Sequence, residues 1–187
     1  MIGTSISRLA TVASVAVLAL MLSAFAGCDD EDSPLFPGVP KDVSAQLAAL
    51  RKSIEPYRAI DAAKAAGYQV VVAHPTGGHT CLTDAQQGGM GVHYLKPTLV
   101  DDSVIAAAPE VLIYEPRADG SLDLVAVEYI IPFDIRGDDQ APPVLFGQQF
   151  KRNYTFNLWA LHAWVMKDNP SGVFADYNPT VSCAHGD

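Results

Sequence analysis

The chain has 187 residues, of which 49% are hydrophobic, and its 21 acidic and 12 basic side chains give a net charge of −9. A surface this acidic offers no electrostatic footprint for nucleic acid, so we expect no nucleic-acid partner. The length and apolar content fit one domain with a sizeable core.

The first 27 residues have the features of an export signal. One basic residue, Arg8, precedes an uncharged apolar run that ends in Ala26 and Gly27, directly before Cys28. This ending resembles the lipobox of bacterial lipoproteins, in which the cysteine receives a diacylglycerol and a peptidase cuts just before it. We therefore predict a signal peptide over residues 1–27 and lipidation of Cys28. An uncleaved membrane helix is the alternative, because about 20 apolar residues can span a bilayer.

Residues 28–42 combine acidic residues with three prolines and one glycine. This composition does not pack, so it predicts an extended tether between the anchor and a domain over residues 43–187. On either interpretation of the N-terminus, the domain is exported and faces the periplasm or the exterior. The membrane, contacted through the lipid anchor, is its expected partner. A small-molecule or envelope partner is left open.

Two cysteines remain if Cys28 is lipidated. An exported chain meets an oxidising compartment, so Cys81 and Cys183 are predicted to form a disulfide. The bridge would close a loop of about a hundred residues and stabilise the fold by up to ~4–5 kcal/mol. Two free thiols that act as ligands or nucleophiles are the alternative.

The first expected element of the domain is a helix that starts at Val43. Val43, Leu47, Leu50 and Ile54 are spaced to fall on one helical face, and Asp42 is placed as the N-cap. The sequence thus predicts an amphipathic helix here.

Two short elements and a loop are expected next. Residues 57–67 predict a second helix that ends at a glycine, and the β-rich run 68–74 predicts a strand. Residues 75–91 contain five glycines and no periodicity, which is typical of a long loop. A short strand over 92–97 is expected to follow it.

The clearest local pattern is a β-hairpin. Two β-rich runs, 110–116 and 121–133, flank a short loop that contains Asp119 and Gly120. Both faces of the second run are largely apolar, so we place it centrally in a sheet.

The remaining segments complete an α+β prediction. Residues 134–147 are expected to form a polar connection, 154–166 a strand, with a helix as the alternative, and 167–183 a turn-rich tail. The sum is one α+β domain, with N-terminal helices packed on a mainly antiparallel sheet of about four to six strands.

Three residues in β-rich segments form a candidate metal site: His93, Glu128 and His162. Two imidazoles and one carboxylate are a ligand set for divalent metals, and a carboxylate in an apolar strand is costly to bury unless it is paired, protonated or metal-bound. No local spacing such as H-E-x-x-H supports a metal. The alternatives are histidines that are hydrogen-bonded in the core, and a Glu128 that pairs with Arg117 across the hairpin or lies at a solvated edge.

Four motifs carry a resemblance to a known family: "MGVHY", "PEVLIYEP", "VEYI" and "LHAWVMKDNPSGVFADYNPTVSC". With them the sequence resembles a family of uncharacterised exported bacterial proteins, over roughly Tyr57 to Cys183. The resemblance implies one intact domain and supplies no catalytic residue.

Three functions are compatible with the sequence. The sequence identifies no catalytic residue and does not decide whether the protein is an enzyme. The leading hypothesis is a non-catalytic binding or envelope-interaction module. An apolar groove lined by Trp164 and Phe174 would support it. The second is a metal-binding protein or metal-dependent enzyme that uses the three residues above, with a divalent metal as cofactor. The third is a purely structural envelope component, with neither pocket nor metal.

Overall fold

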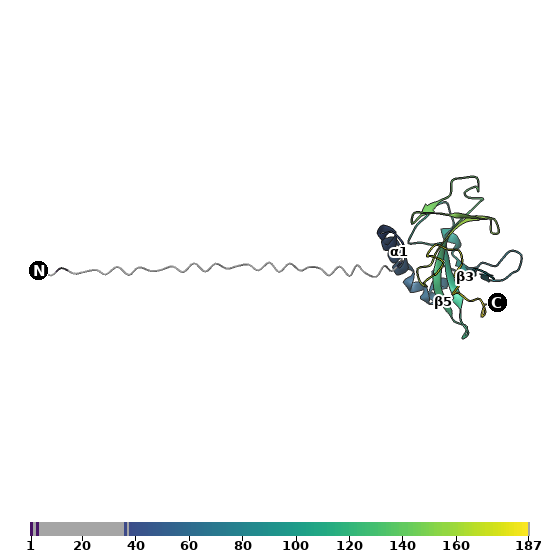
Figure 1. The fold of residues 1–187 in the computed structure, drawn as a ribbon, viewed down its shortest axis with the longest axis horizontal. Coiled ribbons are helices and arrows are strands. Elements are labelled where there is room, and N and C mark those ends of the chain that lie inside the picture. The colour runs from purple at the N-terminus through teal and green to yellow at the C-terminus, as the bar shows by residue number, and fades with distance from the viewer. Residues whose placement is uncertain (2, 4–35, 37, 187) are drawn as a thin grey trace. The chain divides into compact units, whose positions relative to one another are not determined.

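The computed structural model describes residues 1, 3, 36 and 38–186 (Figure 1). Contacts divide the chain into two units, Met1–Ser33 and Pro34–Asp187, and the following concerns the second. The predicted signal peptide, Cys28 and most of the predicted tether lie outside the described residues. Among the helices of the described part, none has the length and apolar character needed to cross a membrane.

The described chain folds into helices and short to medium strands. The helical elements are α1 (Lys41–Ile54), the 3-10 helix η1 (Glu55–Arg58), α2 (Ile60–Ala65) and the 3-10 helix η2 (Pro97–Leu99). The strands are β1 (Val70–Val71), β2 (Cys81–Asp84), β3 (Gly88–Leu95), β4 (Val111–Pro116), β5 (Leu122–Pro132), β6 (Val144–Leu145), β7 (Gln148–Gln149), β8 (Lys151–Asn153) and β9 (Leu158–Ala163).

One antiparallel sheet organises the domain. Its strand order is β1-β3-β4-β5-β9-β8, β2 pairs with the first half of β3, and β6 and β7 form a separate small hairpin. The mainly antiparallel sheet is therefore as predicted, but in the described part of the chain it has seven strands rather than the expected four to six. The hairpin of β4 and β5 is confirmed, and β5 lies inside the sheet between β4 and β9.

Helix α1 buries the apolar face that the sequence indicates. Its buried residues are the four that the periodicity selects, from Val43 to Ile54. The predicted N-cap is wrong: Pro40 occupies that position, without a side-chain cap, and Asp42 lies in the first turn. Proline's fixed φ, here −54°, with a ψ of 146°, supplies the non-helical conformation that an N-cap requires. Beyond α2, Gly67 has the expected positive φ, +101°.

The predicted loop over 75–91 is wrong in its second half, which contains β2 and the start of β3. The glycines of β3 allow other backbone segments to come very close. A Cβ on Gly89 would meet the carbonyl oxygen of Val181 at 2.8 Å, and one on Gly91 that of Tyr114 at 2.6 Å. The expected strand over 68–74 shrinks to the two residues of β1.

The segment 154–166 contains the strand β9, so the helical alternative is excluded. The polar connection predicted over 134–147 contains β6, and β7 and β8 follow it. These strands have two or three residues each, too few to carry an alternating pattern.

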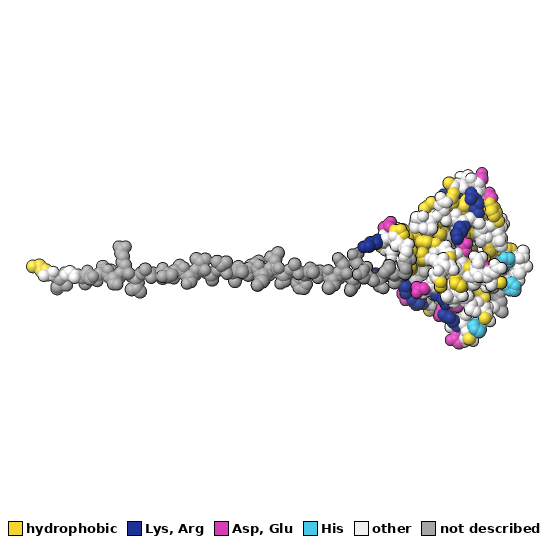
Figure 2. All heavy atoms as spheres, viewed as in Figure 1, with side chains coloured by type: hydrophobic (Ala, Val, Ile, Leu, Met, Phe, Trp, Pro, Cys, Tyr) yellow, Lys and Arg dark blue, Asp and Glu magenta, His cyan; other side chains and the backbone are white. Residues whose placement is uncertain are grey.

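Two apolar clusters lie on opposite faces of the sheet. The larger one contains the buried side of α1 together with alternate strand residues such as Leu112, Tyr129 and Leu161. The smaller one contains strand residues of the other parity, such as Ile113 and Ile130. At the surface, apolar side chains lie scattered among charged and uncharged ones on the face drawn in Figure 2.

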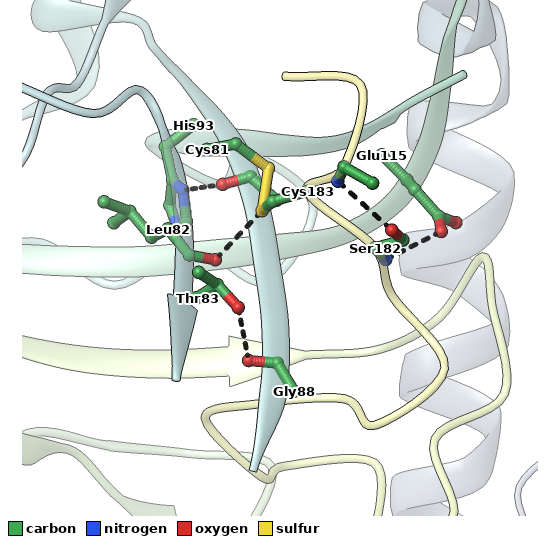
Figure 3. The surroundings of a disulfide bond; sticks show 10 residues. Cys81, Leu82, Thr83, Gly88, His93, Glu115, Ser182 and Cys183 are labelled. Atoms are coloured by element: carbon green, nitrogen blue, oxygen red, sulfur yellow. Dashed lines mark hydrogen bonds between the residues drawn. A yellow bond between two sulfur atoms is a disulfide. The ribbon is translucent and has the colours of Figure 1, made fainter. Parts of the chain in front are cut away.

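The predicted disulfide is present. Cys81 on β2 is bonded to Cys183 near the C-terminus, across a sequence separation of 102 residues (Figure 3). In the chain-entropy account, a loop of this length stabilises the folded state by up to ~4–5 kcal/mol.

Candidate metal site

The three residues of the predicted metal site lie on neighbouring strands and on one face of the sheet. His162 on β9 is directly opposite Glu128 on β5, and His93 lies on β3, one strand beyond β4. All three alternate with residues of the larger apolar cluster, so their side chains share the face of the smaller one. The structure therefore brings together residues that are far apart in the sequence.

Their polar atoms face one another in the interior. The Nε2 atom of His93 is 3.7 Å from Oε2 of Glu128, and Nε2 of His162 is 3.6 Å from Oε1 of the same carboxyl. One ligand atom from each residue can be chosen so that all three lie within 4.8 Å of one another. The exposed fractions of the residues are 2% for both histidines and 8% for Glu128.

A local backbone feature orients His93. Its Nδ1 lies 3.1 Å from the carbonyl oxygen of Gly91, which only accepts hydrogen bonds, so Nδ1 carries the proton. The lone pair of Nε2 is then directed toward Glu128. An outer hydrogen bond from one ring nitrogen to a backbone carbonyl is the usual arrangement for a metal-ligating histidine.

The Gly91 backbone itself depends on a β-bulge. The pairing of β2 with β3 shifts register between Leu82 and Thr83, which leaves Met90 without a partner in β2. Gly91 has a φ of +107°, a conformation that favours glycine. Bulges are common beside functional sites, where they redirect a side chain or a backbone group.

His162 lacks the hydrogen bonds that a buried imidazole ordinarily makes. Neither ring nitrogen has a hydrogen-bond partner, although both are removed from solvent. Its Nδ1 lies 3.8 Å from Oδ1 of Asp176, which is too long for a hydrogen bond. Buried polar groups without partners are rare in folded proteins, and each one needs a physical explanation.

Burial also makes the charged forms of the three groups unfavourable. It raises the pKa of Glu128 to about 8, with a further contribution from Asp176 and Glu110. It lowers the pKa of His93 to about 3, assisted by His162, and the pKa of His162 to about 3, assisted by Lys151. At neutral pH the cluster therefore consists of two neutral imidazoles and a carboxylic acid, so the close approaches are not ion pairs.

Asp176 is a site residue that the sequence analysis missed. It lies in the turn-rich tail after β9, and its Oδ1 accepts a hydrogen bond of 2.7 Å from the Lys151 ammonium group. The tail is fixed against β3 by two backbone hydrogen bonds between Gly89 and Asn178, and the Asn178 side chain is fully buried. The two Asn-Pro turns of the tail and the adjacent glycines at the start of β3 were the sequence signals for this contact, but neither predicts which strand the tail contacts.

The alternative roles for Glu128 do not hold. Arg117 instead donates a hydrogen bond to Asp123 and lies 3.5 Å from Glu115, and Glu128 lies in an inner strand rather than at an edge. An apolar groove lined by Trp164 and Phe174, which would have favoured a binding module, is not formed by these two residues. Trp164 is 2% exposed in the smaller cluster and its indole N–H donates to a backbone oxygen, while Phe174 stacks with Phe146.

The geometry of the cluster fits a metal better than direct hydrogen bonding. The separations of 3.6 and 3.7 Å exceed the usual limit for a hydrogen bond, about 3.2 Å. Two ligand atoms bound tetrahedrally to one ion at 2.0–2.1 Å lie about 3.4 Å apart. Each imidazole Nε2 is within a few tenths of an ångström of that separation from one carboxyl oxygen, and the full set of three ligand atoms, within 4.8 Å of one another, would close further around an ion. Within the described part of the chain, no other three His, Cys, Asp or Glu residues are grouped in this way.

Comparisons of the chain with protein-family models, curated proteins and solved structures give no match. The resemblance to exported bacterial proteins therefore stays a prediction, and the site is interpreted from its own geometry.

Proposed function

We propose that the protein is a metal-binding lipoprotein of the bacterial cell envelope, in which His93, Glu128 and His162 hold one divalent transition-metal ion. Of the three functions that the sequence allows, this is the one that the geometry supports best. The observation that carries it is the convergence of two imidazole nitrogens on the two oxygens of one buried carboxyl, at separations too long for hydrogen bonds, with one of the imidazoles lacking any partner.

The ligand set favours some ions over others. Imidazole nitrogen suits zinc, iron, nickel and copper, whereas magnesium and calcium prefer all-oxygen sites. Two histidines and one carboxylate leave further coordination positions for an outside ligand, as in catalytic zinc sites and non-haem iron sites. We therefore expect zinc or ferrous iron rather than an alkaline-earth ion.

The second half of the proposal concerns location. The disulfide supports export, because such bonds persist in oxidising compartments and are rare in a reducing cytosol. The run that ends at Cys28 supports lipidation. We also infer that α1 and α2 form a layer on the sheet face opposite to the metal cluster, since their buried residues belong to the larger apolar cluster.

The test is the metal content of the full-length chain, purified without chelators and exposed in turn to Zn²⁺, Fe²⁺ and Mn²⁺. We expect about one ion per chain in the wild type and loss of the ion in His93→Ala, Glu128→Gln and His162→Ala. His74→Ala is the matched control, because His74 is half-buried and lies outside the cluster, and it should keep its ion.

Circular dichroism on the same samples separates loss of ligands from loss of the fold. A wild type that takes up none of the three ions, or folded variants that all keep theirs, would overturn the proposal.

A further inference from the structure

Two cavities adjoin the metal cluster. The inner one has a volume of about 40 Å³ and is lined by His93 and Glu128, and the outer one has a volume of about 450 Å³ and is lined by His162 and Asp176. Four side chains line both cavities and therefore stand at their boundary: Leu82, Met90, Asn153 and Phe156. The outer cavity therefore reaches the cluster at His162, and these boundary side chains separate it from the inner cavity at His93 and Glu128.

The inner cavity is small and mostly apolar. Besides His93 and Glu128, only Asn153 contributes a polar side chain to its lining. The apolar side chains that complete it are Val72, Leu82, Met90, Val111, Ile130, Phe156 and Leu158. One water-sized atom needs about 10–15 Å³ of such volume, so the cavity has room for about three.

We propose that the open positions of the metal accept only a small, weakly hydrated ligand of the dioxygen class. This inference rests on the proposed function, because it concerns the ligand of that same ion. A larger organic molecule does not fit the inner cavity, and an ion or a strongly hydrogen-bonding ligand loses hydration against apolar walls without compensation. The outer cavity is large enough for an organic molecule, which would then lie next to the metal ligands without reaching the ion.

The ligand set points in the same direction. Two histidines and one carboxylate on one side of an ion are typical of ferrous sites that keep positions open for dioxygen. Here Glu128 and His93 line the inner cavity and His162 lines the outer one, and the proposal places the open positions of the ion on the side of Glu128 and His93.

The experiment uses the full-length chain loaded anaerobically with Fe²⁺, with nitric oxide as a neutral two-atom probe and imidazole as a bulkier competitor. Binding of nitric oxide is followed by the electron paramagnetic resonance signal and the visible absorption of the iron–nitrosyl complex. We expect the wild type to give the nitrosyl signal and excess imidazole to leave it unchanged.

A boundary variant and a matched control locate the size limit. Phe156→Ala widens the boundary between the cavities, so imidazole should now suppress the nitrosyl signal. Tyr177 lines only the outer cavity, and Tyr177→Ala should behave like the wild type.

The iron content of every sample separates the two proposals. If iron is bound but nitric oxide gives no signal, or if imidazole already competes in the wild type, the inference about ligand size is wrong while the metal site stands. If the wild type binds no iron, the ferrous site and the ligand inference both fail. A Phe156→Ala variant that binds iron and still excludes imidazole would overturn the assignment of the boundary.

Discussion

Replacing Glu128 with glutamine is expected to stabilise the metal-free protein and to remove its response to metal. Burial raises the pKa of this carboxyl from 4.5 to about 8. A group whose pKa is higher in the folded chain than in the unfolded one binds an extra proton on folding between the two values. The metal-free protein therefore loses stability as the pH rises from about 4.5 to about 8.

The size of the effect follows from the two pKa values. At pH 7 the carboxyl is protonated in the folded chain and ionised in the unfolded chain, which lowers the free energy of unfolding by roughly 3 kcal/mol. Glutamine keeps the shape and does not ionise, so Glu128→Gln should raise the free energy of unfolding at pH 7 by up to about that amount. At pH 4.5 this difference between the two proteins should largely vanish.

The histidines have the opposite pH dependence. The pKa values of His93 and His162 are lowered from 6.5 to about 3, so their burial costs stability as the pH falls below about 6.5. Both proteins contain them, and their contributions cancel when the variant is compared with the wild type at each pH.

The assay is urea unfolding of the disulfide-bonded chain at pH 4.5, 7 and 8, with and without metal. Glu115→Gln is the matched control, because Glu115 is equally buried on the sheet but accepts a 2.7 Å hydrogen bond from Lys167, so losing its charge should destabilise the fold. A Glu128→Gln variant that is less stable than the metal-free wild type at pH 7, or that is still stabilised by metal, would refute the reasoning.

Two further predictions concern the bound ion. Asp176→Asn should weaken metal affinity by ~10–100-fold without abolishing binding, because the carboxylate faces Nδ1 of His162 and would orient that ring once the ion is held. Competition with a chelating dye measures the affinity, and an unchanged affinity would exclude the orienting role. Metal uptake at pH 7 should release about one proton, from Glu128 and not from the histidines, whose pKa values of about 3 leave them already neutral. Calorimetry in buffers of different ionisation enthalpy counts this proton, and release of none or of two would contradict the protonation states given above.

The sequence carried enough information to select the three candidate ligands but not to show that they lie close together. Glu128 stood out because it interrupts an apolar strand, and that local contrast survives in the fold. Its convergence with His162 depends on the register between β5 and β9, which is fixed by packing over the whole sheet. A shift by one residue would turn His162 to the other face, and no local pattern excludes that.

The glycine-rich segment before His93 misled for a different reason. Glycine permits both a flexible loop and a strand to which another backbone comes very close, and the sequence alone does not distinguish them. Here the tail that packs against Gly89 decides the outcome, and that tail is held by Asn178 and by the disulfide at Cys183. Asp176 was missed for the same reason, since its position depends on a contact between distant segments.

The energetics of the cluster argue against a purely structural role for it. A valine at position 128 would complete the apolar alternation of β5 and remove the cost of a buried carboxyl, and apolar replacements of buried polar groups are often neutral or stabilising. The imidazoles nearest to the Glu128 carboxyl, at 3.6 and 3.7 Å, are too far away for hydrogen bonds that would offset its burial, and both nitrogens of His162 lack partners. A bound ion changes this balance, because it stabilises the ionised carboxylate and occupies a lone pair of each imidazole. Three side chains whose burial costs stability without an ion would then stabilise the fold with one, which is the relation expected of a binding site.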